Sequence, residues 1–391
     1  MSPVYGRTLR PLWRLQPGAT FLNHGSFGAC PREVLEEQDR LRLEMEAQPD
    51  LFFRERIMPT ADATLLRQAI AALAAFVGAD AEGLALVENA TVATQCVLRA
   101  MPFAPGDEIL VTNHTYNAVR MIVRARCDET GARERVVDLP LHASADAIVQ
   151  RFRDALTPRV RLAIVDHITS PTALAMPVAR LVPELRRWGA KVLVDGAHAV
   201  GHVPLALDSL GADWYTSNAH KWLYAPKGTS FLHAMPEVRE ITPAPVVSHY
   251  ANLGFPRSFD YIGTRDYTAW LALPAALRFA EGLQPVAASA YRTSLIAHGT
   301  QVLGALGIHP VAGEDLNCAM RSFLLRQDRP ATAGDAEALV RHLWQAHRIQ
   351  AMAVAFEGAL LLRVSAQVYV DRQDLDALAS ALDREGWAAR C

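Results

Sequence analysis

The sequence contains very little lysine. Only Lys191, Lys221 and Lys227 occur among 391 residues, whereas arginine is frequent and forms no basic tract. The formal net charge is −2 and the charges are scattered, so neither a nucleic-acid-binding surface nor an acidic tail is predicted. A general preference for arginine accounts for the composition. Chemistry that requires an amine therefore has three candidate side chains.

Cysteines are also few, and long apolar runs are missing. The five cysteines are odd in number and contain no CxxC pair, so we expect neither a disulfide framework nor a metal site. No apolar run is long enough to span a bilayer, and residues 1–18 lack the apolar core of a signal peptide. We therefore expect a cytoplasmic protein with no membrane segment.

Strand-like and helix-like patterns alternate through most of the chain. The hydrophobic content of 51% over 391 residues is sufficient for a large core and two domains. The alternation predicts an α/β fold with a mainly parallel sheet. Its strands are expected at residues 84–87, 109–112, 135–138, 162–166, 192–194, 214–217 and 229–233, and its helices begin near residues 31, 60, 117, 145, 267 and 286.

The pattern changes near the C-terminus. Predicted strands at residues 321–325, 350–356 and 360–365 are interleaved with helices at 335–346 and 372–384, which indicates a smaller α/β domain. We expect three parts: an N-terminal arm at 1–20, a large domain at 21–280 and a small C-terminal domain at 281–391.

Polar residues follow several predicted strands at the point where each ends. Asp195 follows an apolar run, and polar clusters follow two other strands at residues 113–117 and 166–172. The carboxyl ends of parallel strands meet at one edge of the sheet, where α/β proteins bind ligands. Glu88, Asn89, Ala90 and Thr91 begin a predicted helix and form a candidate phosphate site, although an ordinary Thr helix cap would give the same pattern.

The stretch at residues 191–228 holds all three lysines. Lys191 precedes a strand at its amino end, away from the ligand edge, and Lys227 lies in a Pro-Lys-Gly turn, so Lys221 is the candidate for chemistry. A pyridoxal phosphate enzyme needs a lysine for a Schiff base, an acid for the pyridine nitrogen and an anion site for the phosphate. Lys221, Asp195 and the turn at residues 88–91 supply these three features.

Several motifs together resemble the class V aminotransferase family. They are ENAT, NHTYNA, DHITSPT, VDGAHA and SNAHKWLYAPKG, and LNHGSFGA with DGAHAVG is similar to the isopenicillin N epimerase-like branch. The resemblance covers almost the whole chain. It implies a fold-type I pyridoxal phosphate enzyme, with a large domain on a mainly parallel seven-stranded sheet flanked by helices and a smaller C-terminal α/β domain.

The resemblance also implies roles around the cofactor ring. Lys221 would form the Schiff base, and Asp195 would pair with the pyridine nitrogen. His114 would stack on the ring face. Ser170 and His198 would lie near the phenolic oxygen.

For the phosphate, the resemblance implies a site shared between two subunits. Ala90, Thr91, Asn218 and His220 would hold the phosphate, and Thr264 would reach in from the second subunit of a homodimer.

The resemblance assigns the substrate carboxylate to Arg363, because a guanidinium binds carboxylates in bidentate geometry, and Asn23 and His24 are further substrate-binding candidates. Desulfurases of the family carry a nucleophilic cysteine shortly before this arginine. Residues 326–362 contain none, and Cys318 leads into a core strand. Persulfide-forming desulfuration is therefore disfavoured.

Three reactions of an amino acid at Cα stay open. Epimerisation needs an acid-base group on the ring face opposite Lys221, with His24, Tyr116 or a water held by them as candidates. β-Elimination by a carbon-sulfur lyase of the cysteine desulfhydrase type needs only Lys221 as base, and transamination needs release of pyridoxamine phosphate. A binding protein without turnover is disfavoured because Lys221, Asp195 and Arg363 are all present.

Overall fold

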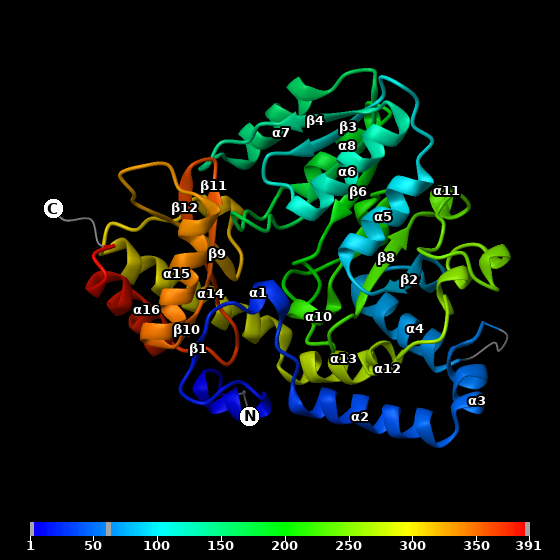
Figure 1. The fold of residues 1–391 in the computed structure, drawn as a ribbon, viewed down its shortest axis with the longest axis horizontal. Coiled ribbons are helices and arrows are strands. Elements are labelled where there is room, and N and C mark those ends of the chain that lie inside the picture. The colour runs from blue at the N-terminus through cyan, green and yellow to red at the C-terminus, as the bar shows by residue number, and fades with distance from the viewer. Residues whose placement is uncertain (1–3, 60–63, 388–391) are drawn as a thin grey trace.

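The large part of the molecule is built on a seven-stranded sheet, in the computed structural model that describes residues 4–59 and 64–387 (Figure 1). The strand order is β2-β8-β7-β6-β5-β3-β4. Only β8 runs antiparallel to its neighbours, so the mainly parallel seven-stranded sheet predicted from the sequence is confirmed. The strands are β2 (Leu84–Val87), β3 (Glu108–Thr112), β4 (Arg133–Val137), β5 (Val160–Asp166), β6 (Lys191–Asp195), β7 (Trp214–Ser217) and β8 (Ser230–Ala234).

Helices cover both faces of this sheet (Figure 1). Successive side chains of a strand point to opposite faces, so the apolar strand residues divide between two clusters. Ile109 and Val111 pack with α5 (Ala90–Ala100) and α6 (Asn117–Thr130), whereas Leu110 and Val194 lie in the other cluster. That second face is covered by α4 (Leu65–Val77), α7 (Ala145–Ala155) and α8 (Val178–Arg187). Burial on both faces explains why these strands are continuous apolar runs.

The C-terminal part is a smaller α/β unit. Its antiparallel sheet has the order β11-β12-β9, with β9 (Met320–Leu325), β11 (Met352–Phe356) and β12 (Ala359–Ser365). Its helices are α14 (Pro285–Gly304), α15 (Ala333–His347) and α16 (Arg372–Arg384). The N-terminal arm packs here, because Gly6 N donates to Val368 O and β1 (Thr20–Phe21) pairs with β10 (Ile349–Gln350).

Two predicted elements are interrupted in the structure. The helix expected from residue 267 is divided at Ala272 into α12 (Thr268–Leu271) and α13 (Leu273–Gly282), where Pro274 begins a new first turn. The strand expected at residues 350–356 is divided between β10 and β11, which pair with different partners. The helix expected from residue 60 is described from Leu65 as α4, and residues 60–63 lie outside the described part.

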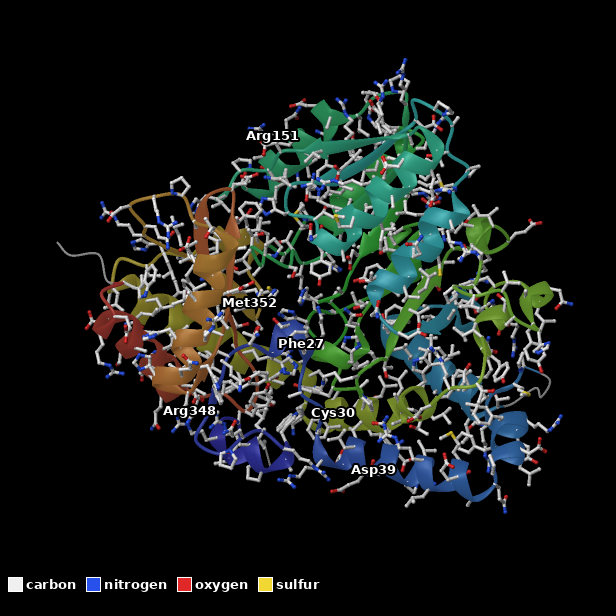
Figure 2. All side chains as sticks on the ribbon, viewed as in Figure 1. Phe27, Cys30, Asp39, Arg151, Arg348 and Met352 are labelled. Carbon is white, nitrogen blue, oxygen red and sulfur yellow. The ribbon has the colours of Figure 1, made fainter. Side chains whose placement is uncertain are left out.

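The remaining α-helices lie near the sheet edge and on the molecular surface. They are α1 (His24–Phe27), α2 (Arg32–Ala47), α3 (Pro49–Phe52), α9 (Leu207–Leu210), α10 (Ala219–Trp222) and α11 (Pro236–Arg239). In Figure 2, Phe27 at the end of α1 lies between the seven-stranded sheet and the C-terminal part. None of the helices in residues 4–59 and 64–387 is long and apolar enough to cross a membrane.

Candidate active site

Two buried carboxyl groups end neighbouring strands at one edge of the sheet. Asp166 on β5 is the register partner of Asp195 on β6, and the two residues are 3% and 4% exposed. Burial raises the pKa of both, and the charge of Asp195 raises the pKa of Asp166 further. Ala197 N donates to Asp195 Oδ1 at 2.9 Å, whereas Asp166 Oδ2 has no hydrogen-bond partner. A cation bound beside Asp195 would favour the ionised form of this carboxyl group.

Lys221 is a half-buried amine near this acid. It lies on α10, the short helix that directly follows β7. Its Nζ is 3.4 Å from His198 Nε2. Burial and, to a lesser extent, the charge of Arg363 lower its pKa from 10.5 to about 7, while the charge of Asp195 opposes the shift. A substantial fraction of the amine is therefore neutral near pH 7, and the neutral amine is the form that attacks a carbonyl.

Lys191 and Lys227 lack this environment. Lys191 Nζ forms an ion pair with Asp213 at 2.9 Å at the amino end of β6, away from the acid pair. Lys227 is exposed in the turn before β8. Of the three lysines, Lys221 alone combines a strongly lowered pKa with closeness to Asp195.

The loop after β6 supplies two buried histidines with different partners. His202 Nε2 accepts from Ala319 N at 2.9 Å, so its Nδ1 carries the proton and donates to His198 O. Its ring stacks on Trp222 with centroids 3.8 Å apart. His198 Nδ1 has no partner, and burial with the charge of Lys221 lowers the pKa of His198 well below its ordinary value. His198 is therefore a neutral ring free to contact a ligand.

His24 lies behind Lys221 and is completely buried. Its Nδ1 is 2.7 Å from Tyr369 Oη and its Nε2 is 3.0 Å from Lys221 O, so both ring nitrogens are engaged. Burial lowers the pKa of His24 to about 3. This neutral ring is suited to positioning the Lys221 backbone and has no free nitrogen for proton transfer.

A close backbone contact holds the same region together. Gly28 has φ +67°, and a Cβ at this position would lie 2.1 Å from His220 O and 2.9 Å from Lys221 Cα. The left-handed conformation and the lack of space both require glycine. The segment that contains His24 therefore packs directly against the backbone that carries Lys221.

Arg363 forms a second centre from three remote segments. It lies on β12 and is 3% exposed, its Nη1 donates to Ser170 O at 2.6 Å, and its Nη2 donates to Ser26 Oγ at 2.7 Å. Ser26 Oγ in turn donates to Asn23 Oδ1 at 2.6 Å. No carboxylate in the described residues forms an ion pair with Arg363, and burial lowers its pKa to about 10. An unpaired buried guanidinium is suited to a substrate carboxylate.

Two of the expected phosphate residues, Ala90 and Asn218, are in contact at the N-terminus of α5. Asn218 Oδ1 accepts from Ala90 N at 3.0 Å, so this amide is already engaged, while the Thr91 hydroxyl has no partner in the described part of the chain. His220 Nδ1 bonds Thr229 O at 2.9 Å, which leaves Nε2 available. Burial lowers the pKa of His220 to about 4. The free N–H groups of a helix N-terminus favour an anion beside these side chains.

His114 and Tyr116 lie differently although they are two residues apart. His114 is buried, with Nδ1 2.6 Å from Thr172 Oγ1 and Nε2 2.8 Å from Leu139 O, and its ring packs on Phe356. Tyr116 is 48% exposed and lies near enough to Arg363 to affect the pKa of that guanidinium. Both ring nitrogens of His114 are therefore engaged, whereas Tyr116 is half exposed.

Thr264 has neighbours other than Lys221 and the residues around it in the same chain. Its hydroxyl is 2.9 Å from Tyr261 Oη, and it lines a surface hollow with Arg42 and Phe53. The next residue, Arg265, forms an ion pair with Glu88 and lies over the Trp270 ring at 4.1 Å. This loop is thereby tied to the turn that precedes the α5 anion site.

Several site residues were missed in the sequence analysis. Asp166 was recognised only as part of a polar cluster, although its place at a strand end was the signal that could have identified it. Ser26 lies in the LNHGSFGA motif but was given no role, and His202 carries no signal of its own, because their contacts join segments more than 100 residues apart. Burial raises the pKa of Cys318 to about 11, which disfavours a thiolate at this position.

The residues present fit the predicted pyridoxal phosphate. Asp166 Oδ2, His198 Nδ1 and Arg363 Nε are buried polar atoms without protein partners, and all belong to this site. A neutral amine, a buried acid and a helix N-terminus surround them. This donor set matches an aldehyde, a pyridine nitrogen and a phosphate, respectively.

Solved structures share the fold of this chain. A cystine C-S lyase in complex with its product cysteine persulfide has a TM-score of 0.79 at 21% identity, over 94% of this chain and 97% of that one. A cysteine desulfurase from Thermococcus onnurineus NA1 has a TM-score of 0.81 at 16% identity, covering 98% and 99%. At this identity the likeness shows the fold alone.

Sequence comparison identifies the family. The model of the aminotransferase class-V family matches residues 30–378, and the chain therefore belongs to the class V aminotransferase family. Isopenicillin N epimerase from Streptomyces clavuligerus is 34% identical over 391 residues, covering 94% of this chain and 95% of that protein. The putative L-cysteine desulfhydrase 1 of Oryza sativa subsp. japonica is 39% identical over 68% of this chain, and the match spans 58% of the length of that protein.

Proposed function

We propose that this protein is a pyridoxal phosphate-dependent enzyme that acts at Cα of an amino acid or an amino-acid-derived substrate. The observation that carries the proposal is the Lys221 amine, whose Nζ is 3.4 Å from His198 Nε2 and whose pKa is lowered to about 7 by burial and by the charge of Arg363. An amine at this pKa both attacks a carbonyl and exchanges a proton near neutral pH. Membership of the class V aminotransferase family supports the same activity.

Each part of the cofactor has a candidate partner in this chain. Asp195 would bind the ring nitrogen, His198 and Ser170 the phenolic oxygen, and Lys221 the aldehyde carbon. Thr91 and His220 would hold the phosphate. Pyridoxal phosphate, when bound, supplies an electron sink that stabilises a carbanion at Cα.

We propose epimerisation as the reaction. Arg363 would bind the substrate carboxylate and orient the Cα–H bond, and Lys221 would remove the proton from its own face. The opposite face requires a second acid-base group. Tyr116 is the better candidate because it is exposed near Arg363, whereas both nitrogens of His24 are engaged. Similarity over 95% of isopenicillin N epimerase supports this choice.

A second candidate is β-elimination from cysteine or a related thiol amino acid. The observation that favours it is the 39% identity to a putative L-cysteine desulfhydrase. This reaction needs Lys221 as the single base and a side chain that can leave. It does not need a cysteine nucleophile, which agrees with the raised pKa of Cys318.

One experiment separates the reactions. The purified holoenzyme is incubated with a panel of amino acids in deuterated water, and α-hydrogen exchange identifies the substrate. Epimerisation predicts exchange with inversion detected by chiral chromatography, and Tyr116→Phe should slow inversion more than exchange. Pyruvate with ammonia and sulfide would replace the epimerase proposal by elimination, and a keto acid formed with pyridoxamine phosphate would replace it by transamination.

We also propose a homodimer in which Thr264 contributes to the phosphate site of the partner. The support is that Thr264 shares a surface hollow with Arg42 on α2 and with Phe53, the residue that follows α3, and that no residue of α10 lines this hollow. Light scattering should give twice the chain mass. Thr264→Ala should weaken cofactor binding. In a mixed dimer with a Lys221→Ala chain, one site combines Lys221 of the first chain with Thr264 of the second. Recovery of cofactor binding in such mixed dimers would show that the two subunits share a site. A monomer with full cofactor affinity would contradict the proposal.

A further inference from the structure

A second cavity lies behind the candidate active site. It has a volume of about 780 Å³ and is bounded by the loop after β6, by α4 and by the start of α14. Its walls are mainly apolar, with Phe76, Val203, Leu205, Leu283 and Val286 among the lining residues. Pockets of this size and apolar character hold small organic ligands.

One positive charge lines this cavity. Arg292 on α14 is 5% exposed, its Nη1 donates to Gly201 O at 3.2 Å, and its Nε has no hydrogen-bond partner. Within residues 4–59 and 64–387, no carboxylate forms an ion pair with this guanidinium. A buried cation without a counter-ion is costly, and a ligand anion would compensate it.

The charge of Arg292 and the apolar walls together define the ligand. A dianion such as a phosphate monoester would require more than one cation, and His202, the other titratable base in the wall, has a pKa lowered well below its ordinary value by burial. A single carboxylate matches a single guanidinium in charge and geometry. The apolar walls favour a hydrocarbon tail on that carboxylate.

The cavity wall is also part of the active site. Gly201 and His202, which line the cavity, belong to the loop that carries His198, and His202 Nδ1 donates to His198 O at 2.9 Å. The His202 ring stacks on Trp222, the residue after Lys221. A ligand in the cavity would therefore contact the opposite side of the loop that faces Lys221.

We propose that this cavity is a binding site for an amphipathic monocarboxylate, with the carboxylate on Arg292 and the hydrocarbon tail against the walls formed by α4 and α14. The site is separate from the proposed substrate centre, because Arg363, which would bind the substrate carboxylate, does not line this cavity.

The test uses octanoate and 1-octanol as matched probes of the holoenzyme by isothermal titration calorimetry. Octanoate should bind one site per chain about 10-fold or more tightly than octanol, because only octanoate gains charge-assisted hydrogen bonds. Arg292→Gln should reduce the affinity for octanoate to that for octanol. Arg363→Met should leave octanoate binding unchanged, which excludes binding at the substrate centre.

A pair of tryptophan variants tests the location. Ala290 lines the cavity, whereas Ala305 is exposed just after α14 and outside it. Ala290→Trp should abolish octanoate binding and Ala305→Trp should retain it. Equal affinities for the two probes, or equal affinity of the two tryptophan variants for octanoate, would overturn the proposal. If a thermal melt shows that Arg292→Gln is not folded, the two tryptophan variants still decide whether octanoate binds in this cavity.

Discussion

Two buried arginines differ in whether their guanidinium group is paired with a carboxylate. Arg67 on α4 is 8% exposed and forms a two-pronged pair with Asp260, through Nε at 2.7 Å and through Nη2. Arg363 on β12 is as deeply buried but bonds only a carbonyl and two hydroxyls. A buried charge that is paired inside the chain depends on its partner for stability, whereas a buried charge without a counter-ion is available to a ligand.

The same difference separates Lys191 from Lys221. Lys191 is paired with Asp213, and Lys221 has a pKa of about 7. The largest expected effect is therefore the loss of activity in Lys221→Ala, by about 10²–10⁴-fold for loss of the base alone. Lys227→Ala, which removes an exposed amine, should keep the visible absorbance of bound cofactor and full activity. Borohydride labelling of another lysine in Lys221→Ala would contradict the assignment.

Arg363→Met should lower kcat/KM by about 10²–10³-fold, because a desolvated charge pair with the substrate carboxylate is lost. Its melting temperature should fall only slightly, since the groups that lose a hydrogen bond are neutral atoms of the half-buried Ser26 and Ser170, and no charge is left unpaired. Steady-state kinetics and a thermal melt measure the two effects. A large loss of stability with unchanged kcat/KM would show that Arg363 is structural.

Arg67→Met should give the opposite result. Asp260, which is 2% exposed, would be left buried without its cation, at a cost of about 3–5 kcal/mol in the free energy of unfolding. Urea denaturation measures this cost, and kcat/KM per folded molecule should stay within about 2-fold of wild type. A stable Arg67→Met with strongly reduced activity would remove the distinction between the two arginines.

Two glycines with nearly equal backbone angles provide a finer test. Gly28 has φ +67° with His220 O 2.1 Å from a Cβ, and Gly254 has φ +68° with open space around it. Gly254→Ala should cost about 1–2 kcal/mol of stability for the left-handed conformation alone. Gly28→Ala should cost about 1–3 kcal/mol more, because the backbone of His220 and Lys221 must move. Equal unfolding free energies would contradict the tight contact.

The smallest expected effect concerns pH. The rate of cofactor attachment to the apoenzyme should rise about 10-fold per pH unit below pH 7 and level off above it, because only the neutral Lys221 amine reacts. The folded-state pKa of Lys221 is depressed, so its contribution to stability also rises with pH above about 7. Arg363→Met should move the midpoint upward, since the charge of Arg363 lowers the pKa of Lys221. Stopped-flow absorbance checks the midpoint, and a pH-independent rate would refute it.

The strand-end residues were predictable because they depend on local patterns. An apolar run that ends in a carboxylate indicates Asp195 at the ligand edge, and the scarcity of lysine leaves Lys221 as the amine. The histidines were not predictable to the same degree. His24 bonds Tyr369 and the Lys221 carbonyl and His114 packs against Phe356, while their predicted roles in proton transfer and ring stacking stay predictions. Those bonds join residues far apart in the chain.

The sequence by itself determined the α/β alternation, the family and the pairing of one acid with one lysine. Periodicity and motif are local properties that a chain carries before it folds. Only the tertiary structure decided that Asp166 stands beside Asp195, that Ser26 and Ser170 hold Arg363, and that Arg292 lines a separate cavity. Burial, pKa and counter-ions depend on which distant segments meet, and in this molecule they distinguish a structural charge from a functional one.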